Sequence, residues 1–160
     1  AIGKNKAEAL KQQLSAFCDE PDISTYGRFD EEGGMATPIM ISAFDNMSAR
    51  KLMFEKWSSL EDREIFIDGR QGPEHGTIFA VLKGQESQYK ESLFDDGEVE
   101  DLECSYKATT HCGMRTASEM VAQLNNYLSN KYFGKLEGTD YSDIRQVNFR
   151  IDFNLSSNDS

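Results

Sequence analysis

The sequence predicts an α/β fold with a mixed sheet, because apolar runs typical of strands alternate with segments of helical periodicity. The clearest strand is the apolar run 38–44, which ends at Asp45 just where a helix should begin. A second run, 65–68, follows that helix and is expected to lie parallel to the first. The tail 147–155 alternates apolar and polar residues, as a strand with one buried face does.

The first predicted element is an amphipathic helix that ends at Pro21, since proline cannot continue a helix. Its apolar face recurs at three- and four-residue spacing and comprises Ala7, Leu10, Leu14 and Phe17. A short strand over 23–29 and a loop with Gly33 and Gly34 are predicted to follow. They lead into the buried strand.

After Asp45, the predicted helix packs Ala49, Met53 and Trp57 against the sheet. Residues 77–83 are predicted as a strand that pairs antiparallel with the segment 87–94, so the sheet becomes mixed. A further amphipathic helix is predicted on a face formed by Ala117, Val121, Leu124 and Leu128.

Length and composition fit a single domain, because 160 residues with 38% hydrophobic residues can bury a core of ordinary size. We expect one domain over 1–155 and a flexible tail over 156–160. No uninterrupted apolar stretch approaches the ~18 residues of a membrane span. The start of the chain also lacks the charged and apolar regions of a signal peptide, so a cytoplasmic location without a membrane partner is expected.

The net charge is −11, with 28 acidic against 17 basic residues. Such a charge repels a phosphate backbone unless the basic side chains are clustered, and the sequence shows no such cluster. Nucleic acid is therefore excluded as an expected partner. The acidic groups gather at 19–20, 30–32 and 95–103, where solvated loops are expected.

The three cysteines are Cys18, Cys104 and Cys112. They form no evident disulfide framework and no C-x-x-C pair of the kind that holds structural zinc. We expect reduced thiols and no structural zinc.

Asp45 has two possible roles. The carboxyl edge of an open α/β sheet is where ligands bind, so Asp45 is placed to meet a nucleotide or a metal ion. In the alternative, Asp45 or Asn46 is simply the N-cap of the following helix, because both side chains accept hydrogen bonds from free helical amides.

Asp68 and His75 would be the acid and base of a hydrolytic pair, but the sequence favours a structural role for this segment. The chain has only two histidines, and neither belongs to a pair with metal-ligand spacing. Asp68 is expected to accept hydrogen bonds from amides of the glycine-containing turn that follows it.

Three segments, in order, resemble the adenylyltransferases that activate ubiquitin-like proteins, a family that includes enzymes of thiamine and molybdopterin biosynthesis. Residues 3–8 resemble its G-x-x-K-x-E segment, and Asp45-Asn46 through Arg50 resembles its D-N-x-x-x-R. Residues 65–76 resemble the strand and glycine-bearing turn that follow. The resemblance covers roughly residues 3 to 125 and implies a partial Rossmann-like three-layer fold.

The resemblance implies that ATP with Mg²⁺ adenylates the C-terminal carboxylate of a ubiquitin-like or sulfur-carrier protein, and that the chain forms a homodimer. Lys6 would lie beside the phosphates, Asp45 would bind Mg²⁺, and Asn46 and Arg50 would complete the nucleotide site. In the alternative, Lys6 is a solvated lysine and Arg50 belongs to a local ion pair.

Cys104 begins a Cys-Ser-Tyr-Lys segment that resembles the region around the thioester-forming cysteine of ubiquitin-type activating enzymes. Its thiolate would attack the adenylate if Lys107 or His111 lowered the thiol pKa, whereas the adjacent Glu103 acts in the opposite direction. Cys112 is a rival because helix N-termini also stabilise thiolates. For Cys104, a free buried thiol is the alternative.

The family's glycine-rich phosphate turn, its ribose-binding acid and an arginine would all precede Ala1, so the chain resembles a truncated member. Three explanations stay open: the sequence is a fragment of a longer protein, another chain supplies the family's first strand, which is missing here, or the chain is a degenerate scaffold. The expected function is therefore an incomplete adenylyltransferase, and the alternative is a non-catalytic scaffold for protein binding or dimerisation.

Overall fold

The computed structural model describes residues 3, 5–17, 22–27, 29–30, 33–95, 109–133 and 145–155. The chain divides into two compact units, Ala1–Met35 and Ala36–Ser160. One domain over 1–155 stays a prediction, and the predicted tail 156–160 lies outside the described residues. Within the described part of the chain, no helix combines the length and the apolar character needed to cross a membrane.

The first unit contains the helix α1, Lys6–Leu14. Asn5 caps its N-terminus by accepting a hydrogen bond from the Ala7 amide at 2.8 Å. A helix forms here, but it ends at Leu14 and not at Pro21 as predicted. None of its residues is buried, and Leu10 is 54% exposed. The strand predicted over 23–29 is wrong, because the described residues there are irregular and contact no neighbouring strand.

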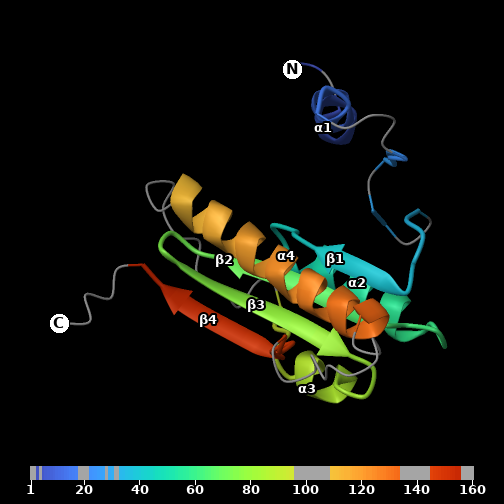
Figure 1. The fold of residues 1–160 in the computed structure, drawn as a ribbon, viewed down its shortest axis with the longest axis vertical. Helices are drawn as coiled ribbons and strands as arrows, with labels where there is room; N and C mark the ends of the chain where they lie inside the picture. Colours follow the sequence, from blue (N-terminus) through green and yellow to red (C-terminus); the bar gives the residue numbers. More distant parts are fainter. Residues whose placement is uncertain are drawn as a thin grey trace. The chain divides into compact units, whose positions relative to one another are not determined.

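The second unit contains a four-stranded mixed sheet in the order β1-β2-β3-β4 (Figure 1). Its strands are β1 Ile39–Ser42, β2 Ile65–Gln71, β3 His75–Leu82 and β4 Arg150–Asn154. β1 runs parallel to β2, whereas β2–β3 and β3–β4 are antiparallel. The predicted α/β class with a mixed sheet is therefore confirmed.

The parallel pair is joined through the helix α2, Met47–Ser58. In the register, Ile39 lies opposite Ile65 and Ser42 lies opposite Asp68, so β1 and the buried part of β2 end at the same edge. Of the residues predicted to face the sheet, Trp57 is fully buried, whereas Ala49 and Met53 are only partly buried. The buried face of α2 also includes Phe54 and Arg50.

The predicted pairing of 77–83 with 87–94 is wrong. β3 pairs with β2 and β4, and the helix α3, Glu86–Lys90, occupies the segment that was expected to be a strand. Tyr89 is the fully buried residue of α3. A helix this short buries only one side chain, that of Tyr89. One apolar residue shows no periodicity, so the sequence pattern could not distinguish a helix from a strand here.

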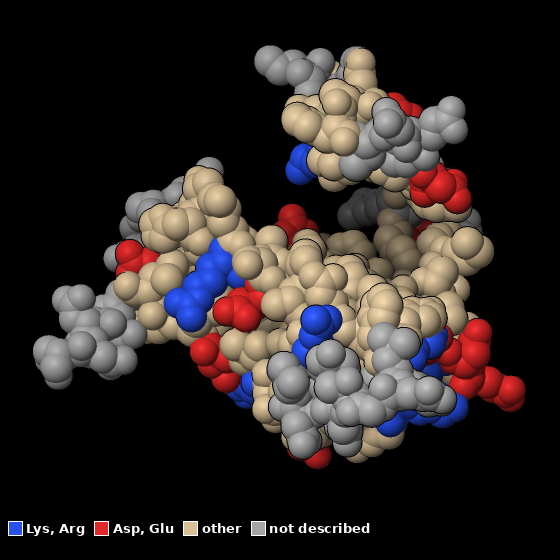
Figure 2. All heavy atoms as spheres, viewed as in Figure 1, with Lys and Arg blue, Asp and Glu red and all other residues tan. Residues whose placement is uncertain are grey.

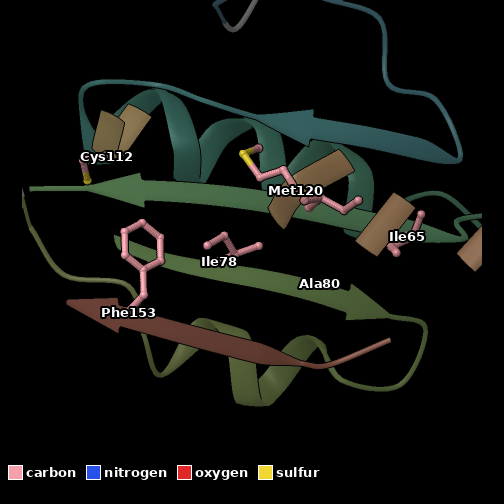
Figure 3. Close-up of a cluster of buried hydrophobic side chains, with 7 residues drawn as sticks. Ile65, Ile78, Ala80, Cys112, Met120 and Phe153 are labelled. Atoms are coloured by element: carbon pink, nitrogen blue, oxygen red, sulfur yellow. The ribbon is translucent and has the colours of Figure 1, made fainter. Parts of the chain in front are cut away.

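The sheet buries side chains on both faces. On one face, side chains of β2, β3 and β4 pack with α4, Thr110–Phe133, in a cluster that includes Ile65, Ile78, Met120 and Phe153 (Figure 3). On the opposite face, alternate residues of β2 and β3 form an aromatic cluster with α2 and α3. That cluster comprises Phe54, Trp57, Phe66, Phe79 and Tyr89.

The helix α4 forms as predicted, and the predicted Leu124 packs against the core, but the rest of the buried face differs from the prediction. Its buried residues are Cys112, Thr116, Met120 and Gln123, whereas the predicted Val121 is 52% exposed and Ala117 is exposed. Glycines explain the close approach of α4 to the sheet. A Cβ atom on Gly76 would lie 3.0 Å from the Thr116 hydroxyl oxygen, and one on Gly69 would lie 2.3 Å from the Met120 sulfur.

Candidate functional site

Asp45 and Asn46 lie in the turn between β1 and α2. Asn46 is the N-cap of α2, because its Oδ1 accepts a hydrogen bond from the Ala49 amide at 2.8 Å. Its Nδ2 donates to Asp45 Oδ1 at 3.1 Å. The capping role that the sequence left open for either residue therefore falls to Asn46, while the Asp45 carboxylate is exposed at the sheet edge.

Arg50 projects from the first turns of α2 into the unit and is only 5% exposed. Its Nε donates to Asp68 Oδ1 at 2.6 Å, and its Nη2 donates to the Phe44 and Gly69 carbonyl oxygens at 2.7 and 3.2 Å. The ion pair offered as the alternative for Arg50 is thus present. It is not local, because Asp68 belongs to β2.

Asp68 is fully buried and engages both of its carboxylate oxygens. Besides Arg50, Arg70 donates through Nε to Asp68 Oδ2 at 2.7 Å, and the Tyr89 hydroxyl donates to the same oxygen at 2.9 Å. Arg70 also donates hydrogen bonds to the carbonyl oxygen and the hydroxyl oxygen of Ser92. We call Arg50, Asp68, Arg70, Tyr89 and Ser92 the Asp68 network.

Burial raises the pKa of Tyr89 well above its ordinary value, and the negative charge of Asp68 raises it further. The phenol therefore keeps its proton at neutral pH and donates a hydrogen bond to the carboxylate. The Asp68 carboxylate receives these side-chain donors in place of the turn amides expected from the sequence. It is not available to act with His75 as a hydrolytic pair.

The Asp68 network was missed by the sequence analysis, although one signal for it exists. Phe66, Asp68 and Arg70 alternate along β2 and therefore point to one face of the sheet. A carboxylate and a guanidinium two residues apart on the face of a buried strand require partners, since isolated buried charges are costly. Tyr89 and Ser92, which come from later in the chain, carry no such signal.

The remaining candidates lie apart in the chain. Lys6 is an exposed residue at the start of α1, in the first unit. Cys104, together with Lys107, lies outside the described residues. Cys112 is fully buried near the start of α4, and its Sγ donates to the His75 carbonyl oxygen at 3.4 Å. Cys112 is therefore a buried thiol that donates a hydrogen bond to the backbone.

The residues that the structure describes contain no group of three or more His, Cys, Asp or Glu side chains arranged to hold a metal ion. Asp45 therefore offers a single exposed carboxylate. One carboxylate is compatible with Mg²⁺, which commonly binds proteins through one or two carboxylates and takes its other ligands from substrate phosphates and water.

No protein-family model matches this chain, and neither a curated protein nor a solved structure is similar to it at a significant level.

Proposed function

We propose that this chain is part of an ATP-dependent adenylyltransferase that activates the C-terminal carboxylate of a ubiquitin-like or sulfur-carrier protein, on a partial Rossmann-like three-layer fold. One observation carries the proposal. Asp45 is exposed where a parallel strand ends and a helix begins, which is where open α/β sheets bind ligands. The D-N-x-x-x-R segment of the resemblance occupies this same turn and the start of α2.

In this proposal Asp45 holds the Mg²⁺ that accompanies ATP. Asn46 keeps the carboxylate in place through its Nδ2 hydrogen bond, while its Oδ1 remains bound to the helix amide. Mg²⁺ contributes electrostatic stabilisation of the charge that develops on the phosphate oxygens.

The reaction is a nucleotidyl transfer followed by acyl transfer. A carboxylate oxygen of the carrier protein attacks the α-phosphorus of ATP, the bond to pyrophosphate breaks, and an acyl adenylate forms. The Cys104 thiolate then attacks the acyl carbon, forming a thioester, and AMP leaves with the electron pair of the broken C–O bond.

Calorimetric titration with Mg-ATP tests the proposed site. The wild-type chain is expected to release binding heat that Asp45→Ala abolishes. Asp62→Ala removes one exposed carboxylate in the turn before β2 and is the matched control, which should bind as the wild type does. Binding that survives Asp45→Ala, or the absence of binding by the wild type, would contradict the proposal.

The alternative function, a scaffold that forms a homodimer, is favoured by a specific feature of α4. Met114 and Val121 are not among the buried residues of α4 and are 69% and 52% exposed. Ala117, which lies between them in the sequence, is exposed as well. Figure 2 shows mostly uncharged atoms over α4, with charged side chains toward its margins. In a chain with net charge −11, an uncharged helix face is where two copies can meet with least repulsion.

Sedimentation equilibrium tests this alternative. The scaffold function predicts a dimer at micromolar concentration that Val121→Glu converts to a monomer. Lys90→Gln makes the net charge more negative by the same amount at an exposed position on α3, and should leave the dimer intact. A wild-type monomer at all accessible concentrations would reject it.

A further inference from the structure

A single guanidinium group connects the turn after β1 to β2. Arg50 Nη2 donates at 2.7 Å to the carbonyl oxygen of Phe44, the residue directly before Asp45. The same nitrogen donates at 3.2 Å to the Gly69 carbonyl oxygen, and Nε donates to the Asp68 carboxylate. Arg50 on α2 therefore connects the turn at Phe44 with two adjacent residues of β2, Asp68 and Gly69.

The position of Arg50 is itself fixed by Asp68. Asp68 is fully buried in a strand whose residues from Ile65 to Gly69 are all buried, so its carboxylate can move little. The contact from Arg50 Nε to Asp68 is 2.6 Å, in surroundings where both side chains are nearly free of solvent. A charge-assisted hydrogen bond of this kind is stronger and more directional than a neutral one.

The turn needs such a connection because it lies between two regular elements. β1 ends at Ser42, and α2 begins at Met47 with Asn46 as its cap. The cap fixes the chain from Asn46 onward, whereas Phe44 and Asp45 belong to neither the sheet nor the helix. The Arg50 hydrogen bond to Phe44 acts within this short segment.

We propose that Arg50 and Asp68 are a positioning pair that holds the turn so that the Asp45 carboxylate stands ready to bind a divalent cation. This inference rests on the proposed function, and it changes the role of Arg50, which acts through the backbone and not on a phosphate. Residues that orient a metal ligand in this way typically change metal affinity by about 10–100-fold when replaced.

Arg50→Lys is the informative variant, because it keeps the charge but removes the planar fork that reaches both Asp68 and Phe44. Arg70→Lys is its matched control. It makes the same chemical change on the other oxygen of Asp68 and leaves the contact with Phe44 intact. The two variants should lose comparable stability, so stability alone does not distinguish them.

Two measurements are made on both variants. Calorimetry should show Mg-ATP affinity reduced about 10-fold or more in Arg50→Lys and within about twofold of the wild type in Arg70→Lys. Hydrogen exchange followed by NMR should show faster exchange of the 44–47 amides in Arg50→Lys alone. Equal losses of affinity in the two variants, or unchanged exchange at 44–47, would overturn the positioning role.

The exchange measurement needs no nucleotide, so the positioning role and the proposed function can fail separately. If the wild type binds no Mg-ATP, the adenylyltransferase proposal and the cation-binding part of this inference are both rejected. Faster exchange limited to 44–47 in Arg50→Lys would then support only a structural connection between the turn and β2.

Discussion

The Asp68 carboxylate is the residue-scale feature on which the second unit most depends. It is fully buried, and it accepts hydrogen bonds from two arginines and one tyrosine that lie on α2, β2 and α3. A buried charge that loses its counter-charge leaves the partner uncompensated, which costs far more than the loss of a surface pair. The network therefore joins both helices on this face to the sheet.

Asp68→Asn is expected to reduce the free energy of unfolding by about 3–5 kcal/mol, since it leaves the buried guanidinium of Arg50 and the partly buried one of Arg70 without a carboxylate. Urea denaturation measures the loss. The control is Asp152→Asn, which breaks the exposed pair with Arg150 and should cost only about 0–1 kcal/mol. Similar small losses for both variants would contradict the importance assigned to the network.

Ser42 offers a prediction of opposite sign. Its hydroxyl is fully buried beside Asp68 in the β1–β2 register, and it has no hydrogen-bond partner among the described residues. Because an unsatisfied buried hydroxyl is costly, Ser42→Ala should leave stability unchanged or raise it by up to about 1 kcal/mol. Thermal unfolding provides the measurement, and a clear loss of stability would show that the hydroxyl has a partner.

At this scale, sequence reasoning predicted where these residues lie relative to a helix, but not which side chains they contact. The sequence placed Asp45, Asn46 and Arg50 correctly around the start of a helix. It could not show that Arg50 pairs with Asp68, because the two are 18 residues apart and meet only when β1 and β2 align. Arg50 is on α2 and Asp68 on β2, and a contact between a helix and a strand depends on tertiary packing, which the local hydrophobic pattern does not specify.

At the scale of elements, the packing of α4 against β3 depends on a glycine. A Cβ atom on Gly76 would lie 2.5 Å from the Phe153 ring as well as close to Thr116. Gly76→Ala should therefore cost about 1–3 kcal/mol through overpacking. The double variant with Phe153→Leu, which removes the ring, should recover part of that loss in urea denaturation. A double variant whose losses simply add would contradict this packing.

A polar contact also fastens α4 to the start of β2. Glu64 accepts hydrogen bonds from Lys131 Nζ at 2.6 Å and the Tyr127 hydroxyl at 2.9 Å. These contacts lower the pKa of Glu64 below 4.5 in the folded state. The hydrogen bond from Lys131 has the largest effect, followed by the one from Tyr127. Burial, with the carboxylate of Glu64 nearby, raises the pKa of Tyr127 to about 12.

The lowered pKa of Glu64 makes the stability of this contact depend on pH. The unfolded chain binds the proton more readily than the folded one, so stability is present above pH 4.5 and is lost as the pH falls through the folded pKa. In Glu64→Gln, the free energy of unfolding should fall less between pH 7 and pH 3 than in the wild type. The difference should be less than about 1 kcal/mol, because the pair is partly exposed. Urea midpoints between pH 3 and pH 7 measure it, and identical profiles would refute it.

The existence of elements was more predictable than their contacts. The helix at 110–133 has apolar residues on two sides, and the sequence favoured the side with Ala117, Val121, Leu124 and Leu128. The structure buries Cys112, Thr116, Met120 and Gln123, and of the predicted face Leu124 packs against the core. Gln123 could be buried because its Oε1 accepts a hydrogen bond from the Asn148 amide at 2.7 Å, a long-range contact that hydrophobic periodicity does not reveal.

At the scale of the whole molecule, the net charge of −11 predicts self-repulsion in the folded state. Raising the salt concentration from about 0.02 M to about 0.3 M at pH 7 should raise the unfolding temperature, because the added ions screen exposed carboxylates. Near pH 4.6, where the net charge is close to zero, the same change should have little effect. Salt that lowers the unfolding temperature at pH 7 would mean that attractive ion pairs dominate.

The central claim is that Asp45 binds the cation of a metal–nucleotide complex at the edge where β1 and the buried part of β2 end. The most direct measurement is NMR of the labelled chain with ATP and trace Mn²⁺, a paramagnetic substitute for Mg²⁺. Cation binding at Asp45 should broaden the 43–47 amide signals and leave those of 61–63, before β2, sharp. Uniform broadening, or none at 43–47, would contradict it.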